Sequence, residues 1–218
     1  MKLQLALDAP EHFALVPRLV QYFDIIEVGT PVLKRFGLSA ISTALELGGG
    51  KPVLADSKTV DGGGLEAEML FRAGASMMTV LASAGLATRE RALAVAGEHG
   101  GDVIFDTILG PSLSAVDLPD QAPGATGRWV GLHSSFDSRG AASAADARAL
   151  EQDNIGRVAQ QHRRGYAVAL MGGINPGNFA AVVEAGPEIA VIGAAVTAAA
   201  DPEGVAKWLR NQISSTRG

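Results

Sequence analysis

The sequence predicts a (β/α)8 barrel, in which eight parallel strands close into a cylinder that helices surround. Eight short apolar or β-branched runs alternate with longer stretches of helical periodicity, and Gly, Pro, Asp or Asn residues separate them. Parallel neighbours need crossover connections, which the intervening helices would supply. The 218 residues amount to about 27 for each of eight units, which suits a compact barrel. No linker or composition shift marks a boundary, so residues 1–218 are expected to form one domain.

The expected strands are short aliphatic runs, as is typical of strands that are buried on both faces. Most of them end at a glycine or at a charged residue, where the chain would turn toward the following helix. In chain order they are Lys2–Asp8, Asp24–Gly29, Pro52–Lys58, Ser76–Leu81, Asp102–Thr107, Trp129–His133, Ala167–Gly172 and Ile189–Gly193.

The expected helices fill most of the gaps between these strands, because apolar residues recur there at helical spacing. Gly74 and Gly186 stand where glycine commonly ends a helix. The segment Gly110–Pro123 contains three prolines and is expected to carry no more than a short helix. In chain order the helices are Glu11–Gln21, Leu38–Leu47, Gly64–Ala73, Thr88–Glu98, Ala144–Arg163, Asn178–Ala185 and Pro202–Ile213.

The structural alternative is a doubly wound open sheet with a dinucleotide site. The fingerprint of that fold places glycines directly after the first strand. Asp8, Ala9 and Pro10 stand there instead, so the closed barrel is the favoured architecture.

The composition excludes several classes of protein. A hydrophobic content of 47% excludes a disordered chain. The absence of cysteine excludes a disulfide scaffold, a thiolate metal site and a cysteine nucleophile. The net charge of −5 argues against a broad nucleic-acid-binding face but leaves room for a local phosphate site. With no long apolar segment and no signal sequence at the N-terminus, we expect a cytoplasmic protein that does not bind membranes.

Charged side chains gather at the predicted carboxyl ends of the strands, the face on which barrel enzymes have their active sites. Charges inside strands are costly unless they are paired or bind a metal, so their convergence on one rim favours a functional site. Asp61 follows in a loop with three consecutive glycines. The residues at the strand ends are Asp8, with Gln4 on its face, Glu27, Asp56, Lys58, Asp106 and His133.

Each of these residues also has a structural interpretation. A strand-end aspartate such as Asp8 or Asp106 can cap the following helix. A single histidine such as His133 can be a satisfied structural residue. Lys58 can simply pair with Asp56, since a spacing of two places both side chains on one face of a strand.

Glycines and small residues follow the seventh and eighth expected strands. Gly172 and Gly173 come after one, and Gly193 and Ala194 come after the other. The loops at these positions of a barrel commonly hold phosphate through backbone N–H groups, which small residues allow to approach the oxygens. The alternative is that these glycines only allow tight turns.

The strand-end residues suit chemistry on a sugar phosphate. Glu27 and Asp56 could hold Mg²⁺, which takes one or two carboxylates and keeps water or substrate oxygens. Such an ion would stabilise an enediolate. Lys58, flanked by carboxylates, would stay charged and donate to a substrate oxygen. Histidine suits general acid–base work at neutral pH, which gives His133 its expected role.

The run Asp56-Ser57-Lys58-Thr59-Val60-Asp61 is an Asp-x-Lys-x-x-Asp motif at the end of the expected third strand. It resembles the signature of the orotidine monophosphate decarboxylase superfamily. With the longer run 54–67, and with Lys2–Asp8 and the run 24–31, the chain is similar to the 3-hexulose-6-phosphate synthase family. The resemblance runs from end to end and is most specific in the first three strands.

The resemblance implies an aldolase-type lyase of formaldehyde assimilation in the ribulose monophosphate pathway. It would use Mg²⁺ and join formaldehyde to ribulose 5-phosphate through a metal-stabilised enediolate. Glu27 and Asp56 would bind the metal, and Lys58, Asp61 and His133 would handle protons and the enediolate. Asp61 would reach into the neighbouring subunit's site, which implies a homodimer with shared active sites. The substrate-binding residues would be Asp8, Gln4, Gly172, Gly173, Gly193 and Ala194.

A sibling family, the 3-keto-L-gulonate-6-phosphate decarboxylases, shares the motif and the metal chemistry. It typically has an arginine where this chain has Ala194, and another shortly after the histidine, so both absences favour the synthase family. Ala82, Ser135 and Ala194 depart from the synthase pattern at the rim. A decarboxylase, another sugar-phosphate lyase with an altered substrate, and a non-catalytic phosphosugar-binding barrel are therefore the alternatives.

Overall fold

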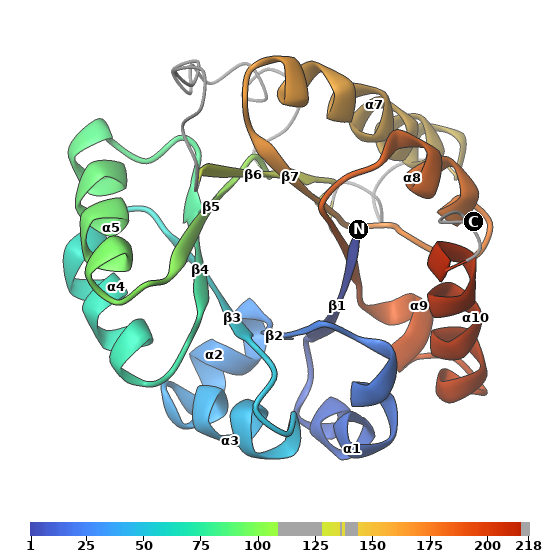
Figure 1. Ribbon diagram of the computed structural model, residues 1–218, viewed down its shortest axis with the longest axis horizontal. Helices are drawn as coiled ribbons and strands as arrows, with labels where there is room; N and C mark the ends of the chain where they lie inside the picture. Colours follow the sequence, from blue (N-terminus) through green and yellow to red (C-terminus); the bar gives the residue numbers. More distant parts are fainter. Residues whose placement is uncertain (109–127, 136, 138–143, 215–218) are drawn as a thin grey trace.

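A computed structural model of the chain describes residues 1–108, 128–135, 137 and 144–214. Its eight strands form a closed barrel in chain order, and each strand runs parallel to both neighbours. Figure 1 shows the strands around a central axis and the helices as a ring outside them. The predicted (β/α)8 barrel is confirmed.

The observed strands agree with the expected ones to within one residue at each end. The barrel closes where the first strand pairs with the last, with Gln4 opposite Val191. The strands are β1 (Lys2–Leu7), β2 (Ile25–Val28), β3 (Val53–Thr59), β4 (Met77–Leu81), β5 (Asp102–Asp106), β6 (Arg128–His133), β7 (Ala167–Met171) and β8 (Ile189–Ile192).

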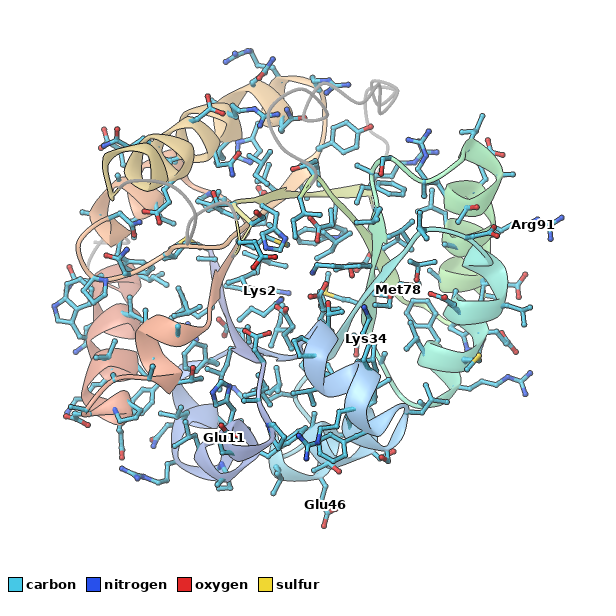
Figure 2. The ribbon with its side chains drawn as sticks, turned by 180° about the vertical axis from the view of Figure 1, so that it is seen from behind. Lys2, Glu11, Lys34, Glu46, Met78 and Arg91 are labelled. Carbon is cyan, nitrogen blue, oxygen red and sulfur yellow. The ribbon has the colours of Figure 1, made fainter. Side chains whose placement is uncertain are left out.

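The helices surround the barrel, and exposed side chains such as Glu46 and Arg91 project outward from the ring (Figure 2). The α-helices are α1 (Val16–Leu19), α2 (Thr30–Phe36), α3 (Ser39–Leu47), α4 (Gly63–Arg72), α5 (Leu86–Glu98), α7 (Ala144–Arg163), α8 (Phe179–Ala185), α9 (Ala194–Thr197) and α10 (Pro202–Ser214). Two 3-10 helices, η1 (Pro10–Leu15) and η2 (Val20–Tyr22), flank α1. No helix in the described part of the chain is long and apolar enough to cross a membrane.

The structure corrects three expectations about helices. The single helix expected over Glu11–Gln21 is wrong, because η1, α1 and η2 divide it; Pro17 lacks an N–H and its ring obstructs the preceding turn. The helix α2 was not predicted, although Pro31 in its first turn is a common start signal. The helix α9 was also not predicted, since its four residues are too few to show a period. The segment Gly110–Pro123 lies outside the described residues.

Two apolar layers hold the barrel together. The larger one lies between the strands and the helix ring, where fully buried side chains such as Met78 pack against α4 and α5. The smaller one fills the barrel interior and contains Ala6, Ile25, Leu54, Met77, Ile104, Ala169, Met171, Ile189 and Val191. The buried polar side chains of Glu27, Asp56, Thr79 and Asp106 lie on the same strands, at or near their carboxyl ends. The apolar interior core therefore lies below a layer of polar side chains near the carboxyl ends of the strands, which we call the rim.

Candidate active site

Asp56 on β3 has a carboxylate that is held by three donors. Its Oδ1 accepts a hydrogen bond of 2.8 Å from the Thr79 hydroxyl on β4. Its Oδ2 accepts from the Thr30 hydroxyl at 2.7 Å and from Lys58 Nζ at 2.5 Å. Three donors from three different segments therefore fix the position of this carboxylate at the rim.

Lys58 has an unusual backbone conformation for a residue in a strand. Its φ of 48° is the only positive value among the described non-glycine residues, which costs on the order of 1 kcal/mol. The β3–β4 register shifts between Ala55 and Thr59, and the Lys58 N–H donates to the Thr79 hydroxyl at 2.8 Å. This irregularity directs Lys58 Nζ between two carboxylates, with Asp106 Oδ2 at 3.4 Å and Asp56 Oδ2 as its nearer partner.

Burial alone would lower the pKa of Lys58. The nearby carboxylates of Asp56 and Asp106 outweigh burial and raise the pKa of Lys58 above its usual value. Lys58 is therefore a permanently charged donor at neutral pH. The pairing of Lys58 with Asp56 that the structural interpretation expects is present, and the side chain lies near the carboxyl end of β3.

Asp106 at the end of β5 is the most deeply buried carboxylate of the rim, at 1% exposure. Its oxygens lie 3.1 and 3.0 Å from His133 Nδ1 on β6, and Oδ1 also accepts from the Ile108 N–H at 2.9 Å. Burial raises the pKa of Asp106, but His133 and Lys58 outweigh it and hold that pKa below the usual range. An ionised carboxylate only accepts hydrogen bonds, so Nδ1 of His133 carries a proton toward Asp106, and Nε2 is the ring atom left for the substrate.

Glu27 on β2 is buried beside Gln4 on β1. The Gln4 Nε2 donates to Glu27 Oε2 at 2.5 Å, while Gln4 Oε1 is buried and has no partner among the described residues. Burial, followed by the negative charges of Asp56 and Asp8, raises the pKa of Glu27 to about 8. Carboxylates therefore crowd this side of the rim, and Lys58 is the cation whose charge partly offsets them.

Asp8 follows β1 and lies at the exposed edge of the site. Burial of its carboxylate and the charge of Asp56 raise the pKa of Asp8. Gly29 allows this position, because a Cβ there would lie 2.2 Å from Asp8 Oδ1. The Asp8 N–H donates to His12 Nδ1 at 3.2 Å, which adds a histidine that sequence reasoning missed.

Asp61 is not part of this cluster. It is exposed, and its Oδ1 accepts a hydrogen bond from the Gly62 N–H at 2.8 Å. Gly62, which follows it, has a φ of 65° and precedes α4. Within one chain, the structure brings Asp56 and Lys58 together and leaves Asp61 on the surface.

Gly172 and Gly173 follow β7 with φ values of 85° and 79°, a conformation that strongly favours glycine. A Cβ at Gly172 would lie 2.2 Å from the Ser134 carbonyl oxygen, and a Cβ at Gly173 would lie 2.2 Å from Glu151 Oε1. Gly172 is therefore required by a backbone contact as well as by its turn, whereas Gly173 is required by its turn and approaches the side chain of Glu151.

Unpaired backbone donors collect at the loops after β7 and β8. Within the described part of the chain, no protein acceptor pairs with the N–H groups of Gly173 and Ile174 in one loop, or of Gly193 and Ala194 in the other. Adjacent N–H groups of this kind form concavities that bind anions. Of the residues predicted to hold phosphate, Gly173, Gly193 and Ala194 have donors available for it, and Ile174 adds one that was not predicted.

Sequence reasoning missed the hydroxyls of Thr30 and Thr79 and gave Asp106 no role. Threonine is common in strands and carries no charge that would mark it. Asp106 was noticed as a strand-end residue, but its contacts with Lys58 and His133 depend on the closure of the barrel. In the described ranges, no group of three or more His, Asp or Glu side chains forms a metal-binding cluster.

Comparisons with known proteins all find relatives in the same family of enzymes. The family model described as "Orotidine 5'-phosphate decarboxylase / HUMPS family" matches residues 1–209. The 3-hexulose-6-phosphate synthase of Mycobacterium gastri is 35% identical and covers 98% of this chain and 100% of its own length. The crystal structure of 3-hexulose-6-phosphate synthase from Salmonella typhimurium has a TM-score of 0.82 at 33% identity and covers 99% of both chains. That of 3-keto-L-gulonate-6-phosphate decarboxylase from Vibrio cholerae has a TM-score of 0.77 at 26% identity, covering 98% of this chain and 97% of its own.

Proposed function

The chain belongs to the orotidine 5'-phosphate decarboxylase / HUMPS family, and from that premise we propose that it condenses formaldehyde with ribulose 5-phosphate to 3-hexulose 6-phosphate. Full-length similarity to synthases of that name supports an aldehyde-lyase of the ribulose monophosphate pathway. The observation that carries the proposal is the continuous set of contacts from Asp56 through Lys58 and Asp106 to His133. It joins a fixed cation to an oriented proton acceptor.

His133 performs the proton transfers in this proposal. Its Nε2 removes a proton from C1 of ribulose 5-phosphate, and the carbanion equivalent that results attacks the carbonyl carbon of formaldehyde. A new C–C bond forms, and the alkoxide oxygen takes the proton back from Nε2. Asp106 holds the ring in the required tautomer through Nδ1 and stabilises the imidazolium between the two steps.

Lys58 supplies the fixed positive charge of the site. Its ammonium donates to the substrate oxygen on which negative charge develops, while Asp56 and Asp106 hold it in place. Asp8, at the exposed edge, accepts hydrogen bonds from substrate hydroxyls, and Gln4 holds Glu27 beneath it. The N–H groups after β7 and β8, at Gly172, Gly173, Gly193 and Ala194, bind the phosphate.

Glu27 and Asp56 fit Mg²⁺ by the chemistry of their donors. Both are carboxylates on adjacent strands, and a pair of carboxylates is the usual protein share of a Mg²⁺ coordination sphere. The pKa of Glu27, raised first by burial and then by Asp56 and Asp8, marks a place short of positive charge. Bound there, Mg²⁺ would supply electrostatic stabilisation for the negative charge that develops on the substrate oxygens.

We propose a homodimer with shared active sites, in which the exposed Asp61 of one subunit serves the site of the other. Exposed apolar side chains stand beside this residue in the chain and on the two helices that follow it, with Val60 at 59% and Leu65 at 72% exposure, and Met69 and Leu86 also exposed. Such a patch is typical of a surface that a second protein covers. We propose that a second copy of the chain covers it.

The test is formaldehyde consumption by the purified protein with ribulose 5-phosphate and Mg²⁺. We expect loss of formaldehyde that depends on the sugar phosphate, disappears with a chelator, and is absent from Asp56→Ala protein. Release of CO₂ from 3-keto-L-gulonate 6-phosphate without formaldehyde consumption would identify the decarboxylase instead. Metal-dependent binding of sugar phosphates without turnover would identify a non-catalytic barrel.

A further inference from the structure

The carbonyl of Gly173 is held by two side-chain amides. Asn175 Nδ2 donates to it at 2.7 Å, and Asn178 Nδ2 donates to it at 3.0 Å. Asn178 also accepts through Oδ1 from the Asn175 N–H at 2.9 Å. The Asn178 side chain therefore uses both of its ends to fold the loop between β7 and α8.

Glu151 on α7 extends this network to the helix ring. Its Oε2 accepts a hydrogen bond of 3.1 Å from Asn178 Nδ2. Its Oε1 lies so close to Gly173 that a Cβ there would be 2.2 Å away. The helix α7 packs against β7 and α8, and Figure 1 shows α7 and α8 next to each other outside the strands.

This network fixes the direction of a backbone donor. In a trans peptide the C=O and the following N–H point to opposite sides. Asn175 and Asn178, in the loop before α8, hold the Gly173 oxygen, so the N–H of Ile174 points to the opposite side of that peptide, away from these two side chains. That N–H has no protein acceptor within the described residues.

We propose that Asn178 and Glu151 are positioning residues for the phosphate group of the substrate. They act through Gly173 and hold the Ile174 N–H ready for an anion, so that no binding energy is spent in ordering the loop. This inference rests on the proposed function, which places the phosphate at this loop. Neither side chain touches the reacting carbon, so their loss affects the binding of phosphate and leaves the chemical step intact.

Four variants test the proposal by kinetics and by direct binding of inorganic phosphate, measured by titration calorimetry. Asn178→Ala should raise the KM for ribulose 5-phosphate and the dissociation constant for phosphate by a similar factor, about fivefold to tenfold for lost hydrogen bonds of ordinary strength, with kcat unchanged. Glu151→Ala should have a smaller effect of the same kind. Glu151→Gln keeps an acceptor oxygen for Asn178 and should behave as the wild type. Glu184→Ala, on the exposed face of α8, is the matched control.

The outcome that overturns the inference is an Asn178→Ala protein whose melting temperature falls while its KM and its phosphate affinity stay unchanged. A wild-type protein that does not bind inorganic phosphate also overturns it, since no anion site would then need positioning. Failure of the proposed function has a different signature. In that case the wild type consumes no formaldehyde, but phosphate binding and its weakening in Asn178→Ala persist.

Discussion

Both carboxylate oxygens of Asp106 lie within hydrogen-bond distance of His133 Nδ1, at 3.1 and 3.0 Å. The same carboxylate lies 3.4 Å from Lys58 Nζ. One buried anion therefore contacts both groups that the proposed reaction needs, the proton acceptor and the fixed cation. Four experiments follow from this arrangement and from its surroundings.

The first prediction concerns Asp106→Asn. The amide keeps the shape of the carboxylate but loses the charge that stabilises a protonated His133 and pairs with Lys58. We expect kcat to fall by about a hundredfold, within the range for impaired acid–base catalysis. Exchange of the C1 proton of ribulose 5-phosphate with deuterium from solvent, followed by NMR without formaldehyde, should slow in parallel. Asp153→Asn, on the exposed face of α7, is the control, and an equal loss there would contradict this assignment.

The second prediction is the pH dependence of stability in chelator-treated protein. The pKa of Glu27 is raised from 4.5 to about 8 in the folded state. Between these pH values the folded protein keeps a proton that the unfolded chain has lost, so its stability falls as pH rises through this window. Glu27→Gln cannot lose a proton there, so its melting temperature should exceed that of the wild type by a margin that grows toward pH 8. A difference in melting temperature that stays constant with pH would contradict the raised pKa of Glu27.

The third prediction concerns the shared active site. Asp61→Ala and Lys58→Ala proteins should each be inactive. If Asp61 serves the partner's site, a mixture of the two should form heterodimers with one complete site, and about a quarter of the wild-type activity should return. Mixing after chemical crosslinking of each homodimer should restore nothing. Persistent inactivity in subunits that do exchange would show that Asp61 serves no partner site.

The fourth prediction concerns the hydrogen bonds of Arg210 near the amino ends of β1 and β2, opposite the candidate active site. Arg210 on α10 donates to Asp24 Oδ2 and to the Tyr22 carbonyl, both at 2.8 Å, and Asp24 also accepts from the Leu3 N–H at 2.8 Å. Arg210→Leu should lower the free energy of unfolding in urea by about 1–2 kcal/mol and leave kcat unchanged. Arg18→Leu removes a more exposed arginine whose ion pair spans 3.4 Å, and it should change stability little. Equal losses of unfolding free energy in both variants would show that the contacts of Arg210 stabilise the fold no more than an exposed ion pair does.

The sequence predicted the barrel and most of its strand ends because these depend on local patterns. Alternating apolar runs and helical stretches determine the order of elements, and Asp56, Lys58 and His133 stand at strand ends that are visible in the chain. The division of the helix around Pro17 was foreseeable from the proline itself. The four residues of α9 were not, since so short a helix has no periodicity.

Contacts across the barrel were the part that the sequence could not give. The pair of Asp106 and His133 depends on the register between β5 and β6, in which Asp106 lies opposite Gly131, two residues before His133. The hydroxyl of Thr79 reaches Asp56 because β3 and β4 are neighbours whose register pairs Leu54 with Met77 and Ala55 with Met78. The contact of Glu151 with Asn178 joins α7 to the residue that precedes α8, and neither segment has a sequence pattern that predicts it. Such pairings follow from the closed geometry and from no local pattern.

The most direct test of the central claim is the fate of ¹³C-formaldehyde incubated with ribulose 5-phosphate, Mg²⁺ and the protein. The proposed chemistry predicts a six-carbon ketose phosphate that carries the label at C1, bonded to the former C1 of ribulose 5-phosphate, and none of it with Lys58→Ala. Labelled formaldehyde that remains free, with ribulose 5-phosphate unchanged although Mg²⁺ is present, would contradict the proposed condensation.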